Sequence, residues 1–131
     1  MKRIFRFLFV AVCTAVLVAC SASPASLREQ GHEPLNNAQL SNAFSDSTLK
    51  WRIPGSVSGT TRYMADGRAV TNWGEGDRAG NWRTEDGELC TRYEGVDGGE
   101  ATCYTIFRID GEYRFFVGGE LNSTGRIVDS E

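Results

Sequence analysis

Few side chains in this sequence could do chemistry on a substrate. The chain holds a single histidine, His32, and catalytic pairs of serine or cysteine with histidine need one beside the nucleophile. Paired carboxylates could still support glycoside hydrolysis. The acidic residues available for this lie in or beside predicted turns, where turn chemistry alone explains them: Asp66, Glu75, Asp77, Asp86 and Glu88. We therefore expect no catalytic residues, and we predict that the protein is not an enzyme and needs no cofactor.

The first 19 residues are predicted to be a signal peptide. Lys2, Arg3 and Arg6 give a basic start, and an apolar run extends from Ile4 to Val18. This run is shorter than a segment that spans a bilayer, and small residues follow it. We therefore expect the segment to be removed on export.

A short motif ends at Cys20. The stretch Leu17-Val18-Ala19-Cys20 resembles the lipobox of bacterial lipoproteins. The resemblance implies that Cys20 carries a lipid anchor with palmitate-like acyl chains and becomes the N-terminus. Ser21 rather than aspartate follows Cys20, which in lipoproteins in general implies the periplasmic face of the outer membrane. The alternative is an ordinary secretory signal that ends at Ala19 or within residues 22–25.

Charge narrows the range of partners. Cleavage before Cys20 removes three of the 14 basic residues and none of the 17 acidic ones, which leaves a net charge of about −6 with an acylated N-terminus. Binding to nucleic acid needs a basic stripe, and the sequence has none. We expect a membrane partner through the acyl chains on Cys20, and no nucleic acid.

The remaining cysteines predict a disulfide. Cys13 leaves with the signal and Cys20 takes the lipid, so Cys90 and Cys103 remain in a compartment where disulfides persist. A two-cysteine metal site is the alternative, but it lacks further thiolates and a nearby histidine. We therefore expect one bridge and no bound metal.

The N-terminal part after the signal is predicted to be mostly unstructured. Residues 20–35 are expected to form a flexible tether, because Leu27 is the only large apolar residue between Ser21 and Pro34. From Asn36 to Phe44, apolar residues recur at helical spacing behind an asparagine that can cap the first turn. One short helix that covers an end of the domain is predicted there.

Residues 36–131 are predicted to form a single β domain. Asp-Gly pairs, which favour the positive φ angles of tight hairpins, occur at residues 66–67, 86–87, 97–98 and 110–111. The candidate strands are Thr48 to Ile53, Thr60 to Ala65, Arg68 to Trp73, Gly80 to Thr84, Glu88 to Tyr93, Ala101 to Ile109, Glu112 to Val117 and Gly125 to Val128.

The predicted turns also predict a register. The turn at residues 110–111 pairs Tyr104 with Val117, and a disulfide between facing cysteines puts Leu89 opposite Tyr104. Six residues then share one apolar face, with Phe107 and Phe116 as apolar exceptions on the other: Trp82, Leu89, Tyr104, Ile106, Phe115 and Val117. Independent turn assignments thus agree on which face is the core.

The fold class follows from this pattern. Eight short antiparallel strands with one apolar face favour a mainly β meander that closes into a small barrel, and a two-sheet sandwich is the alternative. Arg108 and Tyr113 lie at the turn end of their hairpin, where a barrel would open. They are the candidate ligand contacts, with an arginine stacked on a tyrosine at the rim as the simpler interpretation.

A second resemblance rests on spacing. Its elements are a short helix with Leu40 and Phe44, then Thr48, Tyr63, Asp66-Gly67, Gly80 and Trp82, Leu89-Cys90, Cys103, and Gly111 and Tyr113. On this pattern, residues 38–128 resemble a family of uncharacterised single-domain envelope proteins of Gram-negative bacteria. The resemblance implies an exported β domain with one disulfide, and it implies no activity.

Together these features predict a lipid-anchored binding or accessory module. Its partner would be an envelope protein, peptidoglycan or a small apolar ligand carried in the barrel. The alternative is an inhibitor of a cell-wall hydrolase that inserts an acidic loop into a basic cleft. The candidate partner loop carries Trp73, Glu75 and Asp77.

Overall fold

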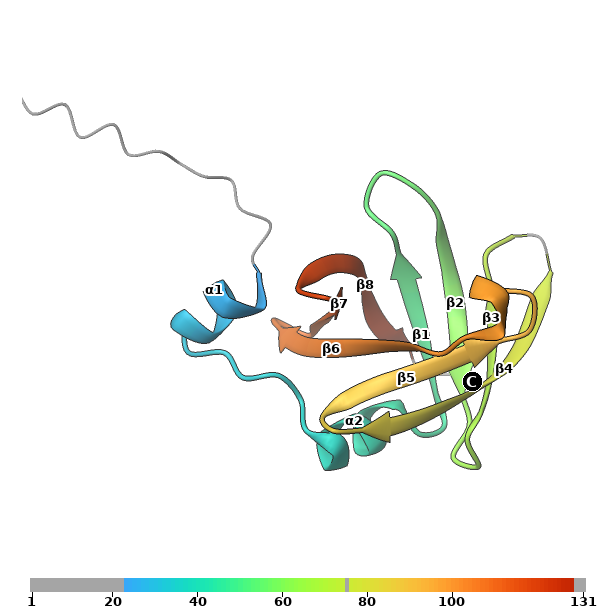
Figure 1. The fold of residues 1–131 in the computed structure, drawn as a ribbon, viewed down its shortest axis with the longest axis horizontal. Helices are drawn as coiled ribbons and strands as arrows, with labels where there is room; N and C mark the ends of the chain where they lie inside the picture. Colours follow the sequence, from blue (N-terminus) through green and yellow to red (C-terminus); the bar gives the residue numbers. More distant parts are fainter. Residues whose placement is uncertain (1–22, 75, 129–131) are drawn as a thin grey trace, which may run out of the picture.

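The computed structural model describes residues 23–74 and 76–128. Eight antiparallel strands form a closed meander in which β1 pairs with both β2 and β8, so the predicted barrel is confirmed over the sandwich (Figure 1). The strands are β1 (Ser47–Arg52), β2 (Ser58–Tyr63), β3 (Arg68–Asn72), β4 (Asp77–Glu85), β5 (Glu88–Tyr93), β6 (Thr102–Ile109), β7 (Glu112–Val117) and β8 (Glu120–Val128).

Two of the Asp-Gly pairs form the tight hairpins that they predict. Asp86 and Gly87 have φ angles of 49° and 75°, and Asp110 and Gly111 have φ angles of 52° and 78°. Two consecutive positive φ angles match the right-handed twist of the flanking strands. These turns fix the register of β4 against β5 and of β6 against β7.

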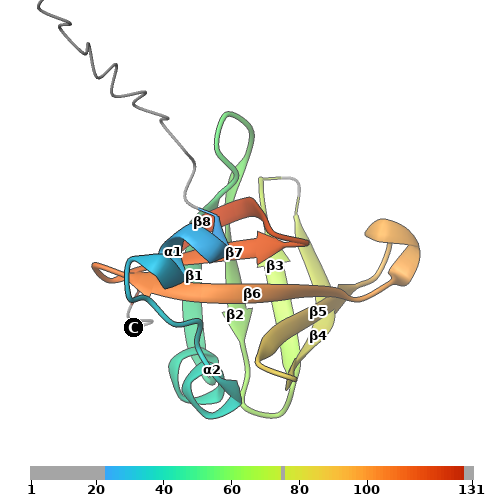
Figure 2. The ribbon, with the colours of Figure 1, turned by 60° about the vertical axis from the view of Figure 1, so that its left-hand side comes forward.

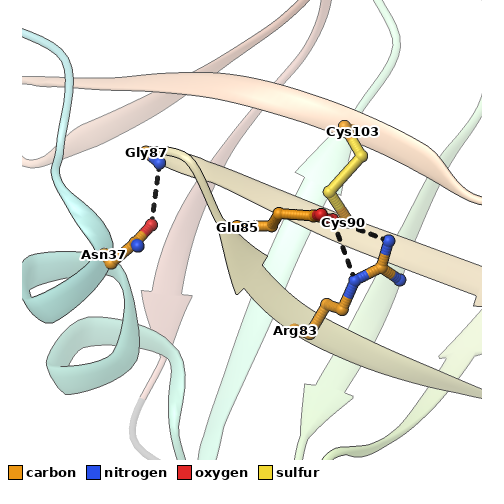
Figure 3. Close-up of a disulfide and its surroundings, with 6 residues drawn as sticks. All are labelled: Asn37, Arg83, Glu85, Gly87, Cys90 and Cys103. Atoms are coloured by element: carbon orange, nitrogen blue, oxygen red, sulfur yellow. Dashed lines mark hydrogen bonds and ion pairs between the residues drawn. A yellow bond between two sulfur atoms is a disulfide. The ribbon is translucent and has the colours of Figure 1, made fainter.

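The predicted disulfide is present between β5 and β6. Cys90 pairs with Cys103 across the two strands, and Leu89 faces Tyr104 one residue away, as predicted. The bridge lies on the outer face of the barrel, beside the ion pair between Arg83 and Glu85 (Figure 3). The covalent link therefore leaves the interior free.

The prediction that Val117 belongs to the core face is wrong. Val117 is 37% exposed, and the β6–β7 register runs only from Thr105 to Ile109 on β6, so Tyr104 has no paired partner on β7. Val117 is the last residue of β7, directly before the Gly118-Gly119 turn. Its side chain lies beyond the part of the sheet that encloses the core.

Helix α2 (Asn37–Phe44) closes one end of the barrel (Figure 2). Asn36 caps it in a reciprocal pair with Gln39, each side chain accepting from the other residue's backbone amide at 2.9 Å. Leu40 and Phe44 are fully buried, and the Phe44 ring contacts aromatic rings on the strands around it. Asn37 accepts a 2.8 Å hydrogen bond from the amide of Gly87, which ties the helix to the β4–β5 turn (Figure 3).

The predicted flexible tether is instead partly helical and packed. Residues Pro24–Glu29 form helix α1, whose N-cap is Ser23, and Leu27 is only 1% exposed. Leu27 packs against Phe107 and Phe116 on the outside of the barrel, which accounts for the two apolar exceptions on that face. The sequence did not predict this contact, because the partners of Leu27 lie 80 or more residues away in the chain. No helix in the described part of the chain is long and apolar enough to cross a bilayer.

We predict that Leu27→Ala destabilises the protein by about 2–4 kcal/mol, because it removes a buried leucine and leaves a cavity between two phenylalanines. Arg28→Ala, on the exposed side of the same helix, is the matched control and should cost less than about 0.5 kcal/mol. Urea unfolding followed by tryptophan fluorescence measures both variants. Equal stabilities would mean that α1 does not dock on the barrel.

Candidate ligand-binding cavity

A cavity of about 310 Å³ lies within the barrel at the end opposite α2. This end carries the β1–β2 and β3–β4 loops, at the top of both ribbon views (Figures 1 and 2). Five aromatic side chains line the cavity, together with threonines from the strands: Trp51, Tyr63, Trp73, Tyr93, Tyr104, Thr61, Thr71, Thr91 and Thr102. An eight-stranded barrel is just wide enough to fill with side chains or to hold one small ligand.

Two inward-facing glycines leave room for the largest rings. A Cβ on Gly59 would lie 2.7 Å from Cζ2 of Trp51, and a Cβ on Gly80 would lie 2.6 Å from Cδ1 of Tyr93. Each would also collide with a backbone carbonyl of the neighbouring strand. The rings of Trp51 and Tyr93 thus lie against the wall in places where any other residue would displace them.

A hydrogen-bond chain satisfies the polar groups of the wall. Trp51 Nε1 donates to Thr61 Oγ1 at 2.9 Å, and the hydroxyls of Thr61 and Thr71 are 2.8 Å apart. Because Thr71 Oγ1 donates to the carbonyl of Thr60, the Thr61 hydroxyl donates to Thr71. No buried side-chain nitrogen or oxygen among the described residues lacks a partner. The wall therefore presents the Trp51 ring with its N–H already paired.

The tyrosines of the cavity remain neutral at physiological pH. Burial raises the pKa of Tyr63, Tyr93 and Tyr104 above the ordinary value for a phenol. The charge of Asp97 adds to this effect at Tyr104, although burial has the larger influence on its pKa. These phenols consequently act as hydroxyls and aromatic surfaces, not as bases.

The rim of the cavity is acidic. Asp97 and Glu100, from the β5–β6 loop, are its charged lining residues, and none of the described residues that line it is basic. Asp97, Gly98 and Gly99 all have positive φ angles, so this loop turns sharply at the mouth. The guanidinium of Arg78 lies 4.9 Å from the centroid of the Trp73 ring, which lines the cavity.

The predicted ligand contacts lie at the other end. Arg108 stacks over Tyr113 at 5.7 Å, and the Tyr113 ring lies 5.1 Å from that of Phe44 in α2. We expected the barrel to open there, but α2 covers this end. The stacked pair matches the simpler interpretation of an arginine at the rim.

The structure separates the residues of the predicted partner loop. Trp73 lines the cavity, whereas Asp77 accepts a 2.9 Å hydrogen bond from Asn72 within its own turn. Glu75 and the predicted lipidation site Cys20 lie outside the described residues. In the part that the structure does describe, no three side chains of histidine, cysteine, aspartate or glutamate gather as metal ligands would.

Trp51, Tyr93 and Asp97 line the cavity but were not predicted as ligand contacts from the sequence. Trp51 and Tyr93 do carry a signal, since each falls on the inward face of a strand that was predicted, at the end away from α2. The sequence did not indicate which end of the barrel the helix covers. Asp97 belongs to a loop, and the alternation of side chains between two faces applies only to strands, so it could not predict where this side chain points.

We predict that Thr61→Val destabilises the protein by about 1–3 kcal/mol, because it leaves Trp51 Nε1 without its acceptor in a partly buried site. Thr60→Val, an exposed position on the same strand, is the control and should change stability by less than about 0.5 kcal/mol. Thermal or urea unfolding of both variants tests this. A similar effect of the two substitutions would show that the hydroxyl chain is unimportant.

Comparisons of the chain with known proteins found no match. No family model matches the chain, no curated protein is significantly similar to it, and no solved structure matches it. The resemblances drawn from the sequence therefore stay predictions.

Proposed function

We propose that this protein is a lipid-anchored, non-enzymatic binding module that carries a small, largely apolar ligand in the open end of its barrel. The cavity of about 310 Å³ is the observation that carries this proposal. Its volume falls at the lower end of the range for small-molecule sites. A lining of aromatic rings with a few polar groups is also typical of such sites.

The chemistry of the wall favours binding over catalysis. The hydroxyls of Thr61 and Thr71 are engaged with each other, and the tyrosines are neutral. Neither thiol of the bridge is free, and the single histidine, His32, precedes the β domain. Asp97 and Glu100 are the only carboxylates among the described residues that line the cavity, and both are exposed to solvent.

The position of α1 supports a link between the anchor and the cavity. Ser23 shares a surface depression with Ile53 and Asn122, and both of these residues also line the cavity. Cys20 precedes Ser23 by three residues, which span at most about 11 Å even when fully extended. An acylated Cys20 would therefore hold the mouth of the barrel close to the bilayer, where an apolar ligand could be exchanged.

The inhibitor alternative has less support. Trp73 contacts Arg78 and lines the cavity, and Asp77 is bonded within its own turn, so neither is presented alone to a partner. A carrier uses the cavity directly, whereas an inhibitor of a wall hydrolase would leave it without a role.

We predict that Thr102→Phe abolishes ligand binding, because it places a ring in the cavity from β6. Thr105→Phe, on the outer face of the same strand, is the matched control and should retain the ligand. Native mass spectrometry of protein extracted from its own membranes measures the bound mass. A ligand retained by Thr102→Phe would place binding elsewhere, and an empty wild-type protein would count against the carrier.

We also predict that Cys20→Ala releases the protein from membranes or blocks its processing. Several acyl chains together make attachment effectively permanent, at roughly 0.8 kcal/mol for each buried CH₂. Membrane fractionation and metabolic labelling with a fatty acid test this. Full membrane retention of the variant, with no label in the wild type, would show that Cys20 is not lipidated.

A further inference from the structure

The charged residues that line the cavity are all acidic. Both ionisable groups that line its rim, Asp97 and Glu100, are carboxylates, and the described lining residues include no lysine, arginine or histidine. Five aromatic residues line the cavity together with these carboxylates. Aromatic ring faces attract cations through their quadrupole, and nearby carboxylates add to that attraction.

We propose that the ligand of this cavity carries a positively charged, alkyl-substituted ammonium group, which the aromatic rings surround and the carboxylates of Asp97 and Glu100 balance. This inference rests on the proposed function, since it assigns a chemical class to the ligand of the same cavity. It predicts that the site discriminates by charge among ligands of equal size.

An anionic ligand does not fit this site. An anion is bound best by cationic or N–H donors that are free to reach it. The N–H of Trp51 is used by Thr61, the hydroxyls of Thr61 and Thr71 are used within the wall, and the remaining side-chain donors of the lining are uncharged. The two carboxylates would moreover repel a negative charge at the mouth.

A bare metal cation does not fit either. Hard cations take six or more oxygen ligands, whereas this wall consists largely of rings and paired hydroxyls. An alkylated ammonium is larger and presents methyl groups to the rings, as in aromatic cages that hold quaternary ammonium ligands. The cavity is about twice the roughly 150 Å³ that suffices for benzene, so it has room for such a group and a short apolar substituent.

The mouth already contains one contact of this kind. The guanidinium of Arg78 lies 4.9 Å from the centroid of the Trp73 ring, within the range of a cation–π interaction. Arg78 is held on the indole and is not among the residues that line the cavity. The contact shows that an aromatic side chain at this rim can bind a cation.

The test compares ligands that differ mainly in charge. Benzyltrimethylammonium, its neutral isostere neopentylbenzene and the anion 3-phenylpropanoate are titrated into the full-length protein, with tryptophan fluorescence as the readout. We expect the cation to bind at least about tenfold more tightly than the neutral isostere, and the anion to bind most weakly. Added salt should reduce this preference, because the carboxylates are exposed at the rim.

Variants assign the preference to named groups. The double variant Asp97→Asn, Glu100→Gln removes both charges with little change in shape, and asparagine tolerates the positive φ of residue 97. It should lower the affinity for the cation about tenfold and leave that for the neutral isostere unchanged. Glu94→Gln, an exposed acid in the same loop that does not line the cavity, is the control and should have no effect. Tyr104→Phe keeps the ring and should preserve the preference, whereas Tyr104→Leu should reduce it.

The outcomes separate this inference from the proposed function. Equal binding of the cation and its neutral isostere, or tighter binding of the anion, would overturn the charge assignment and leave the carrier intact. An unchanged preference in the double variant would overturn the role of Asp97 and Glu100. If none of the three compounds bound, the cavity would not be a ligand site, and the proposed function would fail with this inference.

Discussion

The closure of β8 onto β1 is the constraint on which the rest of this structure depends. Once eight strands form a ring, every inward side chain must either fill the interior or leave a space in it. At one end Phe44 and Leu40 of α2 supply the missing volume. At the other end no element formed by residues 23–74 or 76–128 enters, and the rings that line the wall leave a cavity of about 310 Å³. Core and cavity are thus two ends of one interior.

The glycines of the wall decide how that space is shaped. Gly59 and Gly80 occupy inward positions where a side chain would collide with Trp51 or Tyr93 and with the neighbouring backbone. They let both rings lie against the strands. Thr61 then fixes Trp51 through its indole nitrogen, at a distance of 2.9 Å. A wall fixed in this way is preorganised, so a ligand would lose little affinity to the ordering of side chains on binding.

The outer face of the barrel has separate tasks. Cys90 and Cys103 link β5 to β6 there, and Leu27 docks α1 over Phe107 and Phe116. The docked helix begins three residues after Ser21, so α1 would limit how far a lipid anchor on Cys20 could lie from the cavity. The same residues that make α1 stable therefore also orient the molecule in the proposed function.

Local sequence signals determined much of the fold. The Asp-Gly pairs at residues 86–87 and 110–111 impose their turns, strand alternation then sets the faces, and facing cysteines set the register of β5 against β6. The tertiary structure alone decided which end α2 closes, that Leu27 is buried, and that Trp51, Tyr93 and Asp97 meet at one cavity. The physical reason is range: turn and strand preferences act between neighbours in the chain, whereas burial and cavity formation depend on contacts between distant segments that no local pattern encodes.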